Sequence, residues 1–261
     1  MDCLDGMKLL DNESIDAIIC DLPYGVLHRD NPHAQWDRVI PFAPLWEQYE
    51  RVIKPNGAII LFAQGMFTAQ LMTSNPRLWR YNLVWDKCRK TGFLNANRMP
   101  MRQHEDICVF YKKQPPYHPQ MVKCLPHQKN HSRGTKENPT NRCYGRFNNL
   151  LTVITDEKFP GSIIRYQKEH ESTVYHPTQK PVALIRYLIR TYTNLGGAIL
   201  DSCMGSGTTA VAAIRENRNF VGFELNREYF DIADRRIRQE QQQLSLSLDF
   251  DDTVSYAPIL S

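Results

Sequence analysis

The sequence predicts an α/β fold in which helices cover both faces of a sheet. Short apolar runs that suit buried strands alternate with longer segments in which apolar residues recur at helical spacing. The length of 261 residues fits one large domain, or one domain with an insertion. No run approaches the ~18 apolar residues of a membrane span, and no signal-peptide pattern is present. A cytoplasmic protein is therefore expected.

The first half of the chain carries four predicted strands, over residues 14–20, 58–62, 81–85 and 106–111. A helix is predicted from Leu45 to Ile53, and the Lys-Pro-Asn-Gly stretch at 54–57 is expected to end it. Phe67 and Leu71 indicate a second helix, which ends near Asn75.

The last third shows the same alternation. Pro181 is expected to open a helix over 182–192, and strands at 198–200 and 220–223 flank a helix from Thr208 to Ala213. Asn226 is a candidate N-cap for a final helix. After Gln243, Leu alternates with Ser, which predicts a frayed tail or a docked edge strand.

Between Gln114 and Thr173 neither period persists, so this segment is expected to be a loop-rich insertion. Residues 77–146 contain 15 Lys plus Arg and 4 Asp plus Glu, a net charge of +11. Because the whole chain carries +4, the remainder carries 4 − 11 = −7. This segregation favours a polyanionic partner such as nucleic acid over a merely solvated basic face.

The cysteines and histidines do not form a metal-binding pattern. The seven cysteines are scattered and none lies in a Cys-x-x-Cys pair, which favours reduced thiols over zinc or disulfides. His28 and His33 share a loop but have no third partner, so no metal is expected.

A glycine loop follows the predicted strand at 198–200. Asp201 ends the strand, Gly205 and Gly207 follow, and a helix opens at Thr208, which is the arrangement of a nucleotide site. Glu224 ends the next strand, where it can accept hydrogen bonds from ribose hydroxyls. The stretch GSGTTA also fits a nicotinamide-binding pattern. However, Asp201 would repel a pyrophosphate and suits a cationic amine, which favours S-adenosylmethionine.

Four motifs in the chain resemble those of the DNA amino-methyltransferases, which methylate adenine N6 or cytosine N4. They are DLPYG at 21–25, HPTQKP at 176–181, DSCMGSGTTA at 201–210 and FVGFEL at 220–225. Their order resembles that of the permuted, beta-type branch. Residues 85–112, with GFLNA and HEDICVF, look closest to adenine-specific enzymes of phages and mobile elements.

The resemblance implies a Rossmann-like, seven-stranded methyltransferase sheet with S-adenosylmethionine at the carboxyl ends of the strands. It implies a catalytic half at 1–113, a target-recognition insert at 114–173, a cofactor-binding half at 174–243 and a tail at 244–261. Relatives carry a short strand before the pair that matches Asp2 and Cys3. Since this chain begins at Met1, either an upstream start or a missing edge strand is expected.

The same resemblance implies the cofactor-binding residues. Asp2 and Cys3 would contact the adenine of the cofactor, Thr178 and Lys180 would line its methionine end, and Glu224 would hold its ribose. The expected set is Asp2, Cys3, Asp21, Thr178, Lys180, Asp201, Met204, Gly205, Ser206, Gly207, Thr208, Glu224 and Leu225.

The expected catalytic residues are Asp21, Leu22, Pro23 and Tyr24. The carboxylate of Asp21 and the backbone carbonyl of residue 22 would accept hydrogen bonds from the two N–H groups of the target amine. Residue 22 is Leu, where the family usually has Pro. Pro23 would stiffen the turn, and Tyr24 would offer an aromatic face to a flipped-out base.

DNA contacts are expected from the loop at 26–37, anchored by Trp36 and Asp37, and from the insertion. The candidate residues are His28, Arg29, Lys123, Lys129, Arg133, Lys136, Arg142 and Arg146.

These observations predict a DNA adenine-N6 methyltransferase that acts on duplex DNA. The nearest alternative is cytosine-N4 methylation, although those enzymes more often carry Ser at the position of Asp21. RNA or protein methylation, a catalytically inactive DNA-binding subunit and a nicotinamide oxidoreductase are further alternatives. The resemblance also leaves room for a homodimer and for a cognate nuclease in a restriction-modification system.

Overall fold

The computed structural model describes residues 1–26, 36–124, 156–168, 175 and 179–252, with only the backbone described over 245–252. The chain forms two compact units. One comprises Met1–His118 and Ser162–Ser261, and the other comprises Pro119–Gly161. In the smaller unit, β5 (Val122–Lys123) pairs with β6 (Glu157–Lys158) in antiparallel fashion.

The larger unit is built on a seven-stranded sheet with the strand order β7-β3-β4-β2-β1-β8-β9. Neighbouring pairs from β2 to β9 through β1 and β8 are parallel, whereas β4 runs antiparallel to both β2 and β3. The bounds are β1 Ile15–Cys20, β2 Ile53–Ala63, β3 Trp79–Thr91, β4 Arg102–Phe110, β7 Ile163–Arg165, β8 Ala198–Asp201 and β9 Asn219–Gly222. The predicted α/β class and the seven-stranded sheet are confirmed.

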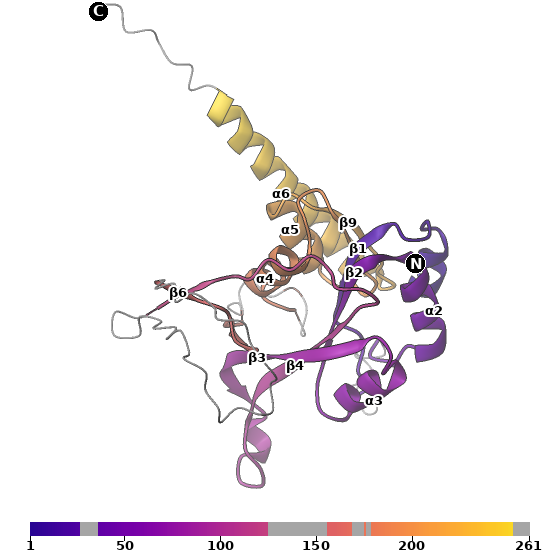
Figure 1. Ribbon diagram of the computed structural model, residues 1–261, viewed down its shortest axis with the longest axis vertical. Helices are drawn as coiled ribbons and strands as arrows, with labels where there is room; N and C mark the ends of the chain where they lie inside the picture. The colour runs from indigo at the N-terminus through magenta and orange to yellow at the C-terminus, as the bar shows by residue number, and fades with distance from the viewer. Residues whose placement is uncertain (27–35, 125–155, 169–174, 176–178, 253–261) are drawn as a thin grey trace, which may run out of the picture. The chain divides into compact units, whose positions relative to one another are not determined.

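Alternate residues of the central strand divide the core into two layers. In β1, Ala17 and Ile19 pack with residues of α4 and α5, while Ile18 and Cys20 pack with residues of α1, α2 and α3. This is the two-residue period of a strand buried on both faces. Figure 1 shows α4 and α5 on one side of β1 and β2, and α2 on the other. The helices are α1 Cys3–Lys8, α2 Phe42–Val52, α3 Met66–Ser74, α4 Val182–Tyr192, α5 Thr208–Arg215 and α6 Arg227–Asp252.

Polar side chains cap two of these helices. The Asp2 carboxylate accepts a hydrogen bond from the Leu4 N–H at 2.8 Å and so begins α1. The predicted N-cap of the last helix is confirmed, because the Asn226 side-chain oxygen accepts from the N–H groups of Glu228 and Tyr229.

Two boundary predictions are wrong. The helix before residues 54–57 does end there, at Val52, but the strand predicted from residue 58 begins at Ile53, and an irregularity in its pairing with β1 absorbs residues 54–57. The tail after Gln243 is neither frayed at its start nor an edge strand, since α6 continues to Asp252. No Gly or Pro interrupts residues 227–252, so the helix-forming Gln, Glu, Arg and Leu side chains prevail over the Leu-Ser alternation.

The segment expected to be a loop-rich insertion contributes to the main sheet. Its residues Ile163–Arg165 form β7, which pairs in parallel with β3 at Val84–Asp86. Three residues are too few to show a sequence period. Within the described ranges, no helix is both long and apolar enough to cross a membrane.

Gly57 supports the crowded region where β2 joins β1. A Cβ atom there would lie 2.8 Å from the Asp16 carbonyl oxygen and 2.7 Å from the Ile53 side chain. We expect Gly57→Ala to lower the free energy of unfolding by about 1–3 kcal/mol in urea denaturation, since the backbone must shift. Gly161→Ala, whose Cβ would meet nothing within 4 Å, is the control and should be neutral. Equal stability of the two variants would contradict this account.

Candidate active site

Three acidic residues gather at one edge of the sheet. Asp21 follows β1, Asp201 ends β8, and Glu224 lies two residues after β9. Because these strands are parallel, their carboxyl ends share one edge, which is the usual ligand-binding edge of such sheets. A cavity of about 580 Å³ is lined by all three residues. That volume suits a small organic cofactor.

The glycine loop between β8 and α5 is held by Glu224. The Gly205 N–H donates to one carboxylate oxygen of Glu224 at 2.7 Å, and the Asn226 N–H donates to the other at 2.7 Å. Gly205 and Gly207 adopt positive φ values of 53° and 81°, which other residues rarely adopt. A carboxylate has about four acceptor sites, so Glu224 retains capacity to bind hydroxyl groups of a ligand.

Asp201 is a buried carboxylate that faces the cavity. Its side-chain oxygen accepts from the Cys203 N–H at 3.1 Å. Burial raises the pKa of Asp201 to about 6, although hydrogen bonds from Thr209 and Cys203 oppose the increase. A cationic group of a ligand would favour the ionised form.

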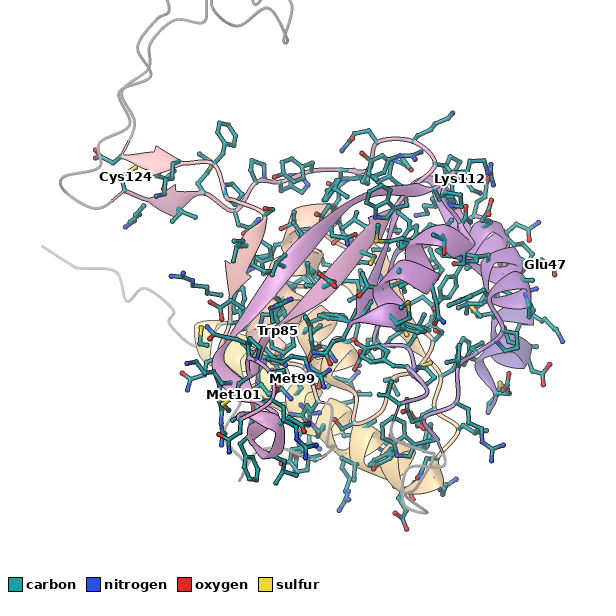
Figure 2. All side chains as sticks on the ribbon, turned by 90° about the horizontal axis from the view of Figure 1, so that it is seen from below. Glu47, Trp85, Met99, Met101, Lys112 and Cys124 are labelled. Atoms are coloured by element: carbon teal, nitrogen blue, oxygen red, sulfur yellow. The ribbon has the colours of Figure 1, made fainter. Side chains whose placement is uncertain are left out.

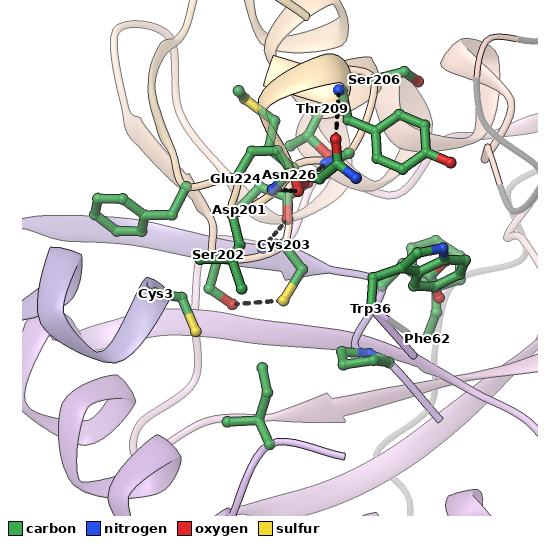
Figure 3. A pocket seen from close by; sticks show the side chains of 18 of the residues that line it. Cys3, Trp36, Phe62, Asp201, Ser202, Cys203, Ser206, Thr209, Glu224 and Asn226 are labelled. Carbon is green, nitrogen blue, oxygen red and sulfur yellow. Dashed lines mark hydrogen bonds between the residues drawn. The ribbon is translucent and has the colours of Figure 1, made fainter. Parts of the chain in front are cut away.

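Thiol and hydroxyl groups line another part of the cavity. Ser202 accepts or donates in hydrogen bonds with the Tyr49 hydroxyl at 2.6 Å and the Cys20 thiol at 3.3 Å. Cys3 and Cys203 lie beside Ser202, and Trp36 and Phe62 lie toward the opposite end (Figure 3). All cysteines described in the structure are free thiols.

The DLPYG motif places Asp21 in the same cavity. One oxygen of Asp21 accepts from the Tyr24 hydroxyl at 2.7 Å, and the other accepts from the Lys180 ammonium. Burial raises the pKa of Asp21, and the charge of Lys180 opposes the increase. The Tyr24 ring packs against Phe67, with ring centroids 4.9 Å apart. One side of the ring expected to stack on a base therefore lies against the protein.

Asp37 fixes the chain that follows the motif. Its two carboxylate oxygens accept from the N–H groups of Gly25, at 2.9 Å, and Val26, at 2.7 Å. The side chain is buried, so these bonds hold both ends of the loop at 26–37 against the site.

The structure brings most of the predicted cofactor residues to the cavity wall. Those lining it are Asp2, Cys3, Asp21, Lys180, Asp201, Met204, Gly205, Ser206, Thr208, Glu224 and Leu225. Gly207 does not line the cavity. It faces α6 instead, where a Cβ atom on Gly207 would lie 2.9 Å from Ala233. Gly207 instead allows α5 and α6 to approach closely.

The predicted catalytic residues divide in two. Asp21 and Pro23 line the cavity. Leu22 is buried in the layer with α2 and α3, and Tyr24 reaches the site only through the hydrogen bond from its hydroxyl to Asp21. Among the predicted DNA contacts, Lys123 is exposed in β5 of the smaller unit. The other predicted residues, namely Thr178, His28, Arg29, Lys129, Arg133, Lys136, Arg142 and Arg146, lie outside the described residues.

Several lining residues escaped the sequence analysis. Trp36, Phe62, Phe223 and Asn226 contribute apolar and amide surface to the cavity. Gln179, within HPTQKP, accepts from the Ser206 hydroxyl at 2.9 Å. Phe223 lies within the FVGFEL motif and Asn226 follows it, so the motif could have signalled both, whereas Phe62 belongs to an ordinary apolar run.

The side chains around the cavity fit S-adenosylmethionine. Asp201 suits an amine, the hydrogen-bonded Glu224 suits ribose hydroxyls, and Phe223 and Leu225 offer apolar surface to a purine. Within the described residues, no group of three or more His, Cys, Asp or Glu could hold a metal ion.

Comparison with known proteins assigns the class. The model of the DNA methylase family, the N6 and N4 methyltransferases, matches residues 15–235. The chain belongs to this family of DNA amino-methyltransferases. Its cofactor is S-adenosylmethionine, in accord with the resemblance that the motifs predicted.

Individual relatives span most of the chain. It is similar to the type II methyltransferase M.HpaI of Haemophilus parainfluenzae, with 27% identity over 91% of this chain and 72% of the relative. It is also similar to the type II methyltransferase M1.MboII of Moraxella bovis, with 26% identity over 89% of this chain and 93% of the relative.

Solved structures show the same fold. The complex of M1.HpyAVI with S-adenosylmethionine matches with a TM-score of 0.59 and 23% identity, covering 90% of this chain and 96% of that one. The PvuII DNA methyltransferase, described as cytosine-N4-specific, matches with a TM-score of 0.64 and 15% identity, covering 90% and 84%.

Asp201 provides a test of the cofactor site. When folding raises the pKa of an acid, the protein loses stability as the pH rises through the pKa of the folded state. For Asp201 this pKa is about 6. At pH 8, relief from burying this charge should stabilise apo Asp201→Asn by on the order of 1–3 kcal/mol. The variant should also bind S-adenosylmethionine at least about tenfold more weakly.

Calorimetric titration and thermal unfolding measure the two effects separately. Wild-type affinity should fall as the pH drops through about 6, and the affinity of Asp201→Asn should lack this dependence. Unchanged cofactor affinity in the variant would remove Asp201 from the binding site.

Proposed function

We propose that the protein transfers a methyl group from S-adenosylmethionine to the exocyclic N6 amine of an adenine flipped out of duplex DNA. One observation carries the proposal: Asp21 lines the same cavity as the two carboxylates suited to the cofactor, Asp201 and Glu224. A hydrogen-bond acceptor for the target amine therefore lies beside the expected methyl donor.

An adenine amine needs alignment more than it needs a strong base, since its lone pair is delocalised into the ring. S-adenosylmethionine supplies a methyl group that its positive sulfur makes electrophilic. Asp21 and the Leu22 carbonyl would accept hydrogen bonds from the N–H groups of the amine. This would direct the nitrogen lone pair toward that methyl group. The carboxylate would also stabilise the positive charge that develops on nitrogen. Afterwards the nitrogen loses a proton to Asp21 or to solvent.

The choice of adenine rests on Asp21. The sequence resemblance associates Asp at this position with adenine-N6 enzymes and Ser more often with cytosine-N4 enzymes. Both reactions use the same alignment of an amine. Cytosine N4 is therefore the second candidate, and the experiment below separates the two.

A basic hairpin supports DNA as the substrate. Beyond the pairing of Asp86 with His104, β3 and β4 continue into a tip that contains the 3-10 helix η2 (Phe93–Asn95). Between Cys88 and Gln103 the hairpin has four Lys or Arg and no Asp or Glu. Phe93 and Leu94 are 73% and 84% exposed, and Met99 and Met101 lie on the same hairpin (Figure 2).

The strand register places this hairpin at the edge that carries the candidate site. Ala63, the last residue of β2, pairs with Asp106 near the start of β4. The hairpin thus leaves the sheet where β1 and β2 end. Basic side chains there would contact phosphates, and the apolar tip would suit insertion beside the gap left by a flipped base.

Further parts of the proposal come from the resemblance. The insertion would supply sequence recognition through Lys123, Lys129, Arg133, Lys136, Arg142 and Arg146, and the loop with His28 and Arg29 would close over the base. A homodimer and a cognate restriction nuclease are compatible with this function.

Asp21 is the residue on which activity should depend. Genomic DNA from a methylation-free host that expresses the wild type should carry modified adenine in one sequence motif. Asp21→Ala should lower the rate about 100-fold or more, because one aligned acceptor is lost. Long-read methylation sequencing measures base type, motif and extent together, and Asp5→Ala, at an exposed carboxylate of α1, is the control.

The outcomes divide the candidates. Modified cytosine would move the assignment to N4 methylation. An unmodified genome from folded, cofactor-binding wild-type protein would contradict DNA methylation by the chain alone.

The hairpin gives a second test. Replacing Phe93 and Leu94 together by Ser should weaken binding to an unmethylated duplex that carries the target motif about tenfold or more. The dissociation constant for the cofactor should not change. Leu195→Ser is the matched control, since Leu195 is 74% exposed and precedes the amino end of β8 at the opposite edge. Fluorescence anisotropy measures the binding, and equal DNA affinities would exclude a role for the tip.

A further inference from the structure

Four charged side chains form a buried cluster beneath the DLPYG motif. Lys180 lies between two carboxylates, hydrogen-bonded to Asp21 and 3.4 Å from an oxygen of Glu105 in β4. The other oxygen of Glu105 lies 3.3 Å from the Lys87 ammonium in β3. The two carboxylates and the ammonium groups of Lys87 and Lys180 attract one another, which offsets part of the cost of their burial. Lys168 faces this cluster as a third base, and burial lowers its pKa.

The proposed reaction creates a conflict at Asp21. Each carboxylate oxygen already has one donor, the Tyr24 hydroxyl on one and the Lys180 ammonium on the other. Each oxygen can accept a second hydrogen bond, but the ammonium already compensates the negative charge that would stabilise the positive charge developing on the target amine. In this sense the Tyr24 and Lys180 groups compete with the amine for Asp21. Lys180 is the stronger competitor, because it carries a full positive charge and both side chains are largely buried.

Glu105 offers Lys180 another position. The side chain of Glu105 is 11% exposed, and among the described residues its Oε2 atom has no hydrogen-bond partner. A buried acceptor without a hydrogen bond is energetically costly. This same oxygen is the one 3.4 Å from Lys180. A movement of less than about 1 Å would bring the ammonium to normal hydrogen-bonding distance.

We propose that Glu105 is a positioning residue for methyl transfer, which takes the Lys180 ammonium from Asp21 as the target amine enters. The inference rests on the proposed function and adds to it how the acceptor becomes available. The positive charge that develops on the amine then replaces that of the ammonium beside Asp21, while Lys180 remains paired throughout. Phe62, whose ring centroid lies 5.0 Å from the Lys180 nitrogen, supports the ammonium from the side.

The test compares Glu105→Gln with wild type in single-turnover methylation of a duplex that carries the motif. Gln keeps the shape of Glu but gives Lys180 no counter-charge, so the ammonium should stay on Asp21. We expect the rate of methyl transfer to fall about 10- to 100-fold, with the dissociation constant for S-adenosylmethionine changed by less than about threefold.

The pH profile separates positioning from a structural role. The groups facing Lys180 are Asp21, Glu105, Lys87 and Lys168. Burial lowers the pKa of Lys180, and the charges of Asp21 and Glu105 more than reverse this. Glu105→Gln removes one of those charges. The ratio of variant to wild-type rate should therefore rise with pH, because Lys180 loses its proton and releases Asp21 at a lower pH in the variant than in the wild type.

Glu216→Gln is the matched control. Glu216 is also buried and pairs with two cations, Arg186 and Arg190, but it lies at the end of α5 away from the cavity. Its substitution should lower thermal stability and leave the rate and its pH profile unchanged. If Glu105→Gln does not fold, Glu105→Asp serves instead and should show a smaller loss of rate, because its shorter side chain keeps the charge.

The results test the role of Glu105 separately from the proposed function. A Glu105 variant with the wild-type rate, or with a constant rate ratio across pH, overturns the inference while DNA methylation by the wild type stands. Absence of methylation by the wild type would instead contradict the proposed function itself.

Discussion

The parallel pairing of β1 with both β2 and β8 is the constraint on which the site depends. Ile18 pairs with Ile59 on one side and with Leu200 on the other, so β1 lies inside the sheet. Its carboxyl end consequently meets that of β8, and Cys20 contacts Ser202 across 182 residues of sequence. With the strands in this register, the acceptor motif and the glycine loop share one cavity. A shift by one residue would turn Asp21 away from the cavity.

Burial then gives the two aspartates of this edge different properties. Among the residues that the structure describes, Asp201 has hydrogen-bond donors but no ion pair, and burial raises its pKa to about 6. Asp21 is also buried, yet it has the Lys180 ammonium beside it. One carboxylate therefore suits a cation brought by the cofactor, while the other is matched by a cation of the protein. Burial raises the pKa of both groups, and at Asp21 the charge of the neighbouring Lys180 opposes the increase.

Much of the site was predictable because its signals are local. A strand that ends in a carboxylate, a glycine pair before a helix, and Asn226 as a cap each involve a few adjacent residues. The helix α4 begins and ends where its periodicity and Pro181 predicted. These features depend on backbone conformation and hydrogen bonds between near neighbours, so the sequence alone determines them.

Other features required the tertiary structure. Residues 54–57 lie inside β2 although the sequence predicted that the strand begins at residue 58, because Ile53 already pairs with Ile15 of β1 on the far side of the irregularity. β7 forms only where β3 offers an unpaired edge. Lys180 belongs to a motif that the sequence assigned to the cofactor, yet it bridges Asp21 and Glu105, which come from distant segments. Sequence determined which chemical groups were available and the approximate positions of most helices and strands. Only the folded sheet decided which charges meet, because electrostatic partners are set by distance in space.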